Sequence, residues 1–175
     1  MDYNFFMKEA LILAKKALKA GEFPVGCVIV YDGRIISTGA RISTVPDSTN
    51  ELDHAEIIAL RGLAKIDNNT YKKYGLKIDR NRITLFSTLE PCLMCYGAIL
   101  INGISKIIYA YEDPDGGGTG CDLAKLAPLY KDIKPDIIAD IMRKESMELF
   151  KAYFLNKNNK YLRETFFAEY TLSAR

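Results

Sequence analysis

Apolar residues in the first twenty positions recur three or four residues apart, while the lysines among them lie mostly off that stripe. Such spacing places the apolar side chains on one face of an α-helix. Asn4 can cap the start of this helix, and Gly21 can end it. The pattern therefore predicts an amphipathic N-terminal helix whose buried face consists of Phe6, Ala10, Leu13, Ala14 and Ala17.

A β-hairpin is expected next, because residues 25–31 form a run of mostly β-branched and apolar residues. Asp32-Gly33 is a strong signal for a tight two-residue turn, so residues 34–38 should return antiparallel to the first strand. A polar loop follows over residues 43–53. The chain therefore begins with a helix and then a two-stranded unit.

Helices and strands alternate after the polar loop. His54 opens a helix whose apolar positions again recur at helical spacing. Further elements are expected at residues 83–87 (strand), 92–101 (helix), 106–111 (strand), 135–141 (strand) and 145–154 (helix). Strands that alternate with helices after an opening hairpin predict a three-layer α/β/α sandwich around a mixed sheet.

Composition is consistent with one compact domain and excludes a disordered chain, a collagen-like fibre and a disulfide-stapled mini-protein. The 175 residues are 49% hydrophobic and 26% charged, and 24 basic residues nearly balance 22 acidic ones. The net charge of +2 does not by itself indicate nucleic-acid binding. The apolar run at residues 10–14 is too short for a signal peptide or a membrane span, so we expect a cytoplasmic protein without a membrane partner.

Two helix starts carry the candidate chemistry. His54 begins one helix, and Cys92 lies 38 positions later at the start of another. Cys92 and Cys95 are three residues apart, so on a helix they share a face and can bind one ion, with thiolates favoured by the helix dipole. Three protein ligands leave a fourth tetrahedral position for water, as in catalytic zinc sites. The sequence predicts one Zn²⁺ per chain, bound by His54, Cys92 and Cys95.

Glu56 is the expected catalytic residue, because in a first helical turn its carboxylate can lie beside the metal-bound water without ligating the metal. Three alternatives remain at this point. Cys-x-x-Cys alone also occurs as a redox pair or as half of a structural zinc site. A zinc-bound binding protein without catalytic activity is also compatible with these residues. However, His-x-Glu followed by Pro-Cys-x-x-Cys at a second helix start is the signature of zinc nucleobase deaminases.

Several motifs resemble the cytidine deaminase-like superfamily in order and type, most closely the tRNA-specific adenosine deaminases and also the guanine deaminases. They are Pro24-Val25-Gly26, His54-Ala55-Glu56, the run from Thr88 to Cys95, Gly97-Ala98, and the loop around Asp113, Gly117 and Gly120. The resemblance implies a five-stranded sheet, a homodimer, and a CMP/dCMP-type deaminase domain over residues 1–155 with a C-terminal helical tail over 156–175 as part of it. It also implies that Glu56 carries protons from water to the base and to the departing ammonia.

The resemblance also implies residues that bind the substrate, namely Arg41, Ala55, Pro91 and Asp113. Arg41 departs from the family pattern, since relatives carry at this position an asparagine that hydrogen-bonds the base. A guanidinium has only donors, so Arg41 either binds a phosphate or carboxylate or is a solvated residue at the end of a strand. The three glycines at 116–118 are expected to adopt unusual backbone angles in a loop at the pocket edge.

The C-terminal segment also departs from tRNA enzymes, because its basic residues are offset by Glu164 and Glu169. Its apolar stripe is typical of a packed helix or a dimer interface, and the resemblance to guanine deaminases suggests a lid over the pocket. That stripe comprises Leu162, Phe166, Phe167, Tyr170 and Leu172.

The predicted substrate is adenosine in a tRNA anticodon loop, and the alternative is a free base or nucleoside such as guanine, cytosine or cytidine.

Overall fold

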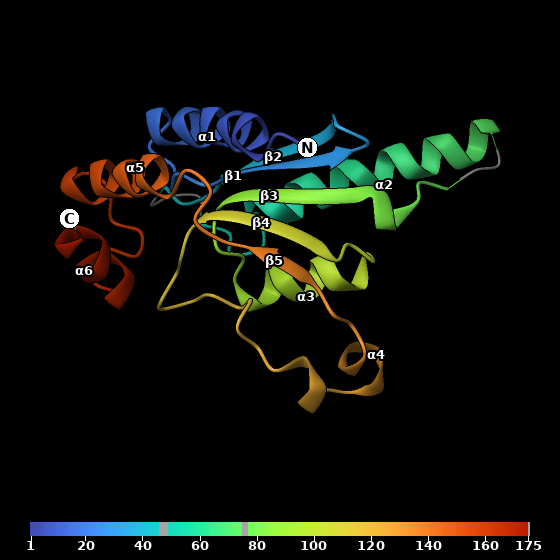
Figure 1. Cartoon of the computed structure of the whole chain (residues 1–175). Coiled ribbons are helices and arrows are strands. Elements are labelled where there is room, and N and C mark those ends of the chain that lie inside the picture. The colour runs from blue at the N-terminus through green and yellow to red at the C-terminus, as the bar shows by residue number, and fades with distance from the viewer. Residues whose placement is uncertain (46–48, 75–76, 175) are drawn as a thin grey trace.

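A five-stranded mixed sheet forms the centre of the molecule (Figure 1). The computed structural model describes residues 1–45, 49–74 and 77–174. The sheet has the strand order β2-β1-β3-β4-β5. Strand β1 pairs antiparallel with β2 and β3, and the pairs β3–β4 and β4–β5 are parallel. The strands are β1 (Gly26–Tyr31), β2 (Arg34–Ala40), β3 (Ile83–Leu89), β4 (Lys106–Tyr111) and β5 (Asp136–Ile138).

Helices cover both faces of this sheet, which confirms the α/β sandwich. Helix α1 packs on one face, and α2 and α3 pack on the other (Figure 1). The helices are α1 (Tyr3–Lys19), α2 (Ala55–Tyr74), α3 (Leu93–Ile101), α4 (Pro128–Lys131), α5 (Arg143–Leu155) and α6 (Phe166–Ser173). Short 3-10 turns, Arg80–Arg82 and Leu123–Lys125, precede β3 and α4. Over the described ranges, no helix is long and apolar enough to cross a membrane.

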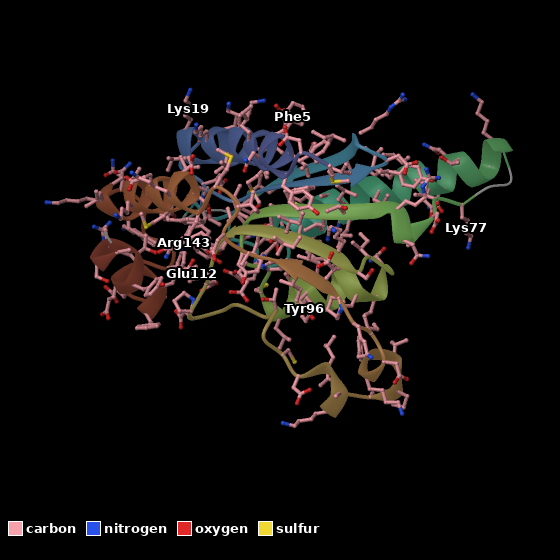
Figure 2. All side chains as sticks on the ribbon, viewed as in Figure 1. Phe5, Lys19, Lys77, Tyr96, Glu112 and Arg143 are labelled. Atoms are coloured by element: carbon pink, nitrogen blue, oxygen red, sulfur yellow. The ribbon has the colours of Figure 1, made fainter. Side chains whose placement is uncertain are left out.

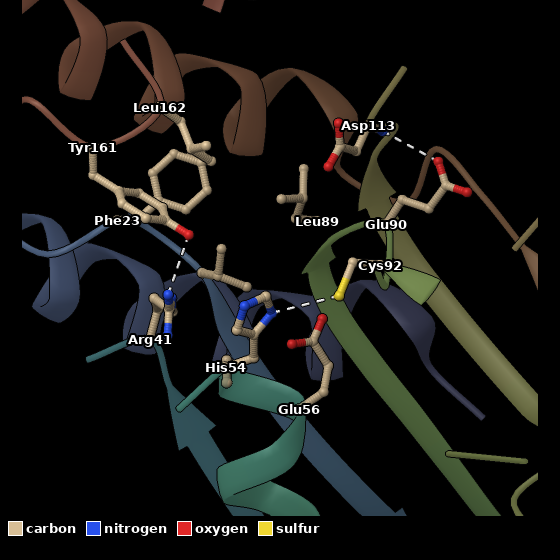
Figure 3. A pocket seen from close by; sticks show the side chains of 12 residues that line it. Phe23, Arg41, His54, Glu56, Leu89, Glu90, Cys92, Asp113, Tyr161 and Leu162 are labelled. Carbon is tan, nitrogen blue, oxygen red and sulfur yellow. Dashed lines mark hydrogen bonds between the residues drawn. The ribbon is translucent and has the colours of Figure 1, made fainter. Parts of the chain in front are cut away.

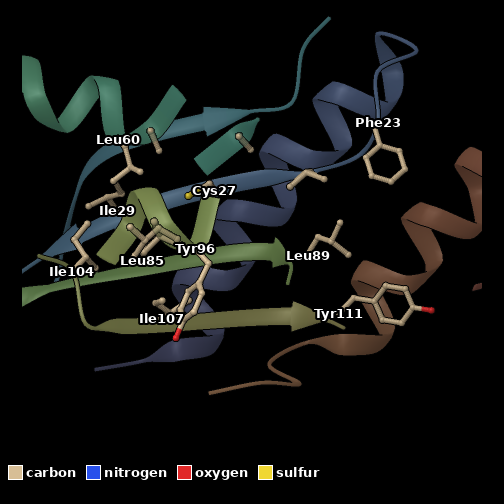
Figure 4. Close-up of a cluster of buried hydrophobic side chains, with 14 of the residues drawn as sticks. Phe23, Cys27, Ile29, Leu60, Leu85, Leu89, Tyr96, Ile104, Ile107 and Tyr111 are labelled. Carbon is tan, nitrogen blue, oxygen red and sulfur yellow. The ribbon is translucent and has the colours of Figure 1, made fainter. Parts of the chain in front are cut away.

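The two faces of β1 divide the core into two clusters, because successive side chains of a strand point to opposite faces. Val28 and Val30 pack with the apolar face of α1, whereas Cys27 and Ile29 pack with α2 and α3 (Figure 4). All four side chains are fully buried. A sheet covered on both faces therefore explains why β1 consists of a continuous run of apolar residues.

The structure confirms the expected hairpin turn and corrects two other expected boundaries, the start of the first helix and the length of the last strand. The N-terminal helix is capped by Asp2, whose carboxylate accepts the backbone N–H of Phe5 at 3.0 Å, so the prediction of Asn4 as the cap was wrong. The hairpin turn is confirmed, since Asp32 and Gly33 both have positive φ, as a type I′ turn requires. Strand β5 is shorter than the expected residues 135–141. Residues 46–48 of the polar loop lie outside the described residues.

The C-terminal tail forms helix α6, which packs onto aromatic side chains of the core. Phe167 is buried and lies within 5.3 Å of Phe150 and 5.7 Å of Tyr111, measured between ring centroids. The Glu112 carboxylate accepts hydrogen bonds from Arg143 and from the Tyr170 hydroxyl (Figure 2). The packed-helix interpretation of the apolar stripe therefore holds for its inner face, while Phe166 and Leu172 remain exposed.

Candidate active site

Two helix N-termini converge beside the ends of β1 and β3. The carbonyl of His54 accepts the backbone N–H of Ile58 at 3.0 Å, so His54 caps α2, and Cys92 is the N-cap of α3. Gly39 allows the start of α2 to lie close to β2, because a Cβ at this position would come within 2.0 Å of the Ala55 carbonyl oxygen. These backbone contacts place the two predicted metal-binding motifs side by side.

The ligand atoms of His54, Cys92 and Cys95 form a cluster that fits a zinc ion. The Nδ1 atom of His54 lies 3.6 Å from the Cys92 sulfur and 3.5 Å from the Cys95 sulfur. Tetrahedral zinc with ordinary Zn–N and Zn–S bonds places nitrogen and sulfur ligands about 3.6 Å apart. Among the described residues these three form the one group that could hold a metal ion, and three protein ligands would leave a fourth tetrahedral position for water.

The pKa values of the two thiols shift in opposite directions in this arrangement. Interaction with the Cys95 thiol, with a further contribution from His54, lowers the pKa of Cys92 to about 4 despite burial. Interaction with Cys92, together with burial, raises the pKa of Cys95. A Zn²⁺ ion requires both sulfurs as thiolates, so zinc uptake would release the proton of Cys95. Two cysteine sulfurs and one imidazole nitrogen are therefore ligands suited to a soft divalent cation.

Glu56 lies within the same cluster and is almost completely buried. The Ser87 hydroxyl donates to Oε1 of Glu56 at 2.8 Å, and the Cys95 thiol donates to Oε2 at 3.5 Å. Burial raises the pKa of the Glu56 carboxyl, although the Ser87 hydrogen bond opposes that shift. A raised pKa brings a carboxyl closer to the pH range in which a general acid–base residue takes up and releases protons.

These side chains lie at the floor of a pocket (Figure 3). Three of the four expected substrate-binding residues line it, whereas Pro91 does not. Sequence reasoning did not assign Phe23 or Tyr161 to the site by name, whereas Leu162 belongs to the C-terminal stripe that was suggested as a lid over the pocket. The lining residues are Phe23, Val25, Arg41, His54, Ala55, Glu56, Leu89, Glu90, Cys92, Asp113, Tyr161 and Leu162.

Asp113 is held at the pocket rim by its neighbours. The Glu90 carboxylate accepts the backbone N–H of Asp113 and of Thr119, both at 3.2 Å.

The expectation of unusual backbone angles for the glycines at 116–118 was wrong, since none of them has positive φ. Close packing explains Gly117 instead, because a Cβ there would come within 2.5 Å of the Asp113 carbonyl oxygen and the Glu90 carboxylate.

An α/β sandwich that joins a three-ligand zinc site to a buried carboxyl at the floor of a pocket defines the zinc-dependent hydrolytic deaminases of nucleobases. Residues 1–111 match the family model described as the cytidine and deoxycytidylate deaminase zinc-binding region. The chain belongs to this family and is a zinc-dependent deaminase. The resemblance drawn from the sequence motifs is thereby confirmed.

Sequence identity to known relatives shows which members of the family this chain is most similar to. The chain is 30% identical over 163 residues to the tRNA-specific adenosine deaminase of Bacillus subtilis, covering 92% of this chain and 95% of that protein. It is also 30% identical to tRNA-specific adenosine deaminase 2 of Xenopus tropicalis, covering 87% of this chain and 89% of that protein. Both relatives are tRNA-specific adenosine deaminases, so within the family the chain is most like enzymes that deaminate adenosine in tRNA.

Solved structures show the same fold. A structure from studies of A-to-I editing by tRNA:A34 deaminases aligns with a TM-score of 0.62 and 29% identity, covering 83% of this chain and 98% of that one. Guanine deaminase from Bacillus subtilis aligns with a TM-score of 0.50 and 34% identity, covering 64% of this chain and 66% of that one. Both nucleobase activities named by the sequence resemblance therefore occur among the structural neighbours.

Proposed function

We propose that this protein deaminates adenosine to inosine in the anticodon loop of a tRNA. The observation that carries the proposal is a groove lined by three basic residues, Lys157, Lys160 and Arg163, and one acidic residue, Glu164. It adjoins the active-site pocket because Leu162 lines both. A nucleotide extruded from an RNA loop could enter the pocket while its neighbouring phosphates contact the groove. The full-length likeness to tRNA-specific adenosine deaminases supports the same substrate.

In this proposal His54, Cys92 and Cys95 hold the zinc ion, which supplies Lewis-acid activation of water when bound. Glu56 accepts a proton from that water, delivers it to a ring nitrogen of the base, and later helps protonate the departing amine. One water is consumed and one ammonia is released, so the C6–N bond breaks as a C6–O bond forms. The Ser87 hydroxyl orients the Glu56 carboxylate.

Deamination of a free base or nucleoside is the second candidate, and one observation favours it. Tyr161 and Leu162 from the C-terminal tail form part of the pocket wall, with Arg41 beside them (Figure 3). Such a wall narrows the entrance, as expected of a pocket for a small molecule. A purine such as guanine is the preferred substrate under this alternative, given the neighbouring guanine deaminase structure.

The activity on an anticodon stem-loop containing adenosine should fall steeply with salt, because Lys157, Lys160 and Arg163 are expected to contact phosphates. Raising salt from about 50 to 200 mM should lower kcat/KM by at least tenfold, and Lys157→Gln with Lys160→Gln should weaken the salt dependence. Ammonia release measures the activity. Turnover of free guanine or cytidine but not of the stem-loop would contradict the tRNA proposal and establish the second candidate.

We also propose that the protein is a cytoplasmic homodimer, with residues 1–155 as its deaminase domain and 156–175 as a helical tail of that domain. Leu93, Ile101 and Leu129 expose more than 60% of their surface, as expected for an interface not yet covered by a partner. Sedimentation equilibrium should therefore give twice the 19.7 kDa chain mass, and Leu129→Glu should weaken the association. A monomer at micromolar concentration would contradict the dimer.

A further inference from the structure

Arg41 lies in the pocket wall, yet its guanidinium is occupied by other parts of the chain. The side chain is only 2% exposed. Its Nη1 donates to the carbonyls of Ile42 at 3.2 Å and Asn50 at 2.8 Å. Its Nη2 donates to Glu51 Oε2 and to the Tyr161 hydroxyl, both at 3.2 Å. The two terminal nitrogens therefore have four protein acceptors, and they are not available to hold a substrate phosphate or carboxylate.

Contacts from three residues fix the position of Tyr161, although it lies 120 residues from Arg41. Its hydroxyl donates to Glu51 Oε2 at 2.7 Å and accepts from Arg41. The Arg41 guanidinium lies 5.4 Å from the centre of its ring, as in a cation–π contact. The ring also packs edge-on against Phe23 at 5.4 Å between centroids. We call Arg41, Glu51 and Tyr161 the latch.

The latch lies next to a strained segment of the pocket wall. Leu162, the residue after Tyr161, has φ of +54°, a left-handed conformation that costs energy for a bulky side chain. Contacts around this segment must therefore stabilise it, and those of Tyr161 with Arg41 and Glu51 are adjacent in the chain. Tyr161 and Leu162 lie across the pocket from Asp113 (Figure 3).

We propose that Tyr161 determines which substrates enter the pocket, and that Arg41 and Glu51 act as positioning residues that hold it there. The inference rests on the deaminase activity of the proposed function. Arg41 thus does not replace the expected asparagine as a base-binding group, since its donors point to the tail and to loop carbonyls. Substrates are instead selected by size, because Tyr161 of the C-terminal segment narrows the pocket entrance. Only compact free bases, or bases fully extruded from an RNA loop, can then enter.

The test compares Tyr161→Phe, which removes only the hydroxyl, with Glu51→Gln and Arg41→Lys. Glu51 is mostly exposed, so its substitution leaves the core intact. Tyr170→Phe is the matched control, because it removes the tail's other tyrosine hydroxyl bond, to Glu112, away from the pocket. For each zinc-loaded variant, kcat and KM are measured for the anticodon stem-loop and for free adenine, guanine and cytosine, and hydrogen exchange is followed over residues 157–165.

Each latch variant should raise KM for the small bases about fivefold to tenfold with kcat nearly unchanged, and should shift the kcat/KM ratio towards the bulkier stem-loop. Tyr161→Phe combined with Arg41→Lys should lose no more than the larger single effect, because both variants break the hydrogen bond between Arg41 and Tyr161. Exchange over residues 157–165 should accelerate in the latch variants only. Tyr170→Phe should leave the kcat/KM ratio unchanged.

Unchanged exchange over residues 157–165 overturns the proposal whatever the substrate proves to be. An equal shift in Tyr170→Phe also overturns it, since the effect would then arise from general loosening of the tail. If the wild-type protein deaminates free bases but not the stem-loop, the tRNA function fails. The latch is then judged on the ratio of kcat/KM for the purines to that for cytosine, which should change in the latch variants alone.

Discussion

Glu56→Gln is expected to lower kcat by about 10²- to 10⁴-fold while the fold and zinc content stay the same. The amide preserves the shape of the side chain and can still meet the Ser87 hydroxyl, which donates to Glu56 at 2.8 Å. It cannot carry a proton from water to the base, because its pKa lies far outside the working range. Ammonia release, circular dichroism and elemental analysis on the same sample measure the three quantities.

Glu90→Gln is the matched control for this prediction. Glu90 is the other glutamate that lines the pocket, but its carboxylate is engaged by the backbone N–H groups of Asp113 and Thr119. Its substitution should disturb the pocket rim and lower activity far less than Glu56→Gln. Activity within tenfold of wild type in Glu56→Gln, at equal zinc content, would move the proton transfer to another group.

Loss of zinc is expected to abolish turnover altogether. His54→Ala or Cys95→Ser removes one of the three ligands, so the metal should be held weakly and activity should fall below detection. Elemental analysis should give one zinc per wild-type chain. Chelation should inactivate the wild type, and added Zn²⁺ should restore it, because the remaining fold packs independently of the metal around two apolar clusters.

Cys121→Ser serves as the control for the ligand substitutions. Cys121 is a half-buried free cysteine outside the ligand cluster, so its loss should leave zinc content and turnover unchanged. Full activity in a protein from which zinc is absent would refute the zinc-dependent mechanism. Zinc loss in Cys121→Ser would place this residue in the metal site.

Periodic patterns were sufficient for most of the fold, because a strand buried on both faces or a helix buried on one imposes a local repeat on the sequence. The apolar run of β1 and the Asp32-Gly33 turn are examples. The prediction of Asn4 as a cap failed for a local reason, since Asp2, two residues earlier, can also cap and does so. Short elements such as α4 carry too few residues for a periodic signal.

The functional residues also fall into two groups, those predictable from a local pattern and those that depend on the tertiary structure. His54-Ala55-Glu56 and Cys92-Leu93-Met94-Cys95 are predictable because each motif is short and lies at a helix start, and because residues three apart, such as Cys92 and Cys95, share one face of a helix. The sequence alone therefore determines the class of chemistry. The expected role of Arg41 as an anion-binding residue could not be settled from its residue type, since its four acceptors come from three separate segments.

Only the tertiary structure decides how the pocket is closed. Tyr161 meets Arg41 across 120 residues of chain, and the contact depends on how α5 and the segment after it pack against Phe23. No local repeat encodes such a contact, because it is the outcome of side-chain packing between segments distant in sequence. Two short sequence motifs thus determine the zinc chemistry. The shape of the pocket entrance, in contrast, depends on where the C-terminal tail lies in the folded protein.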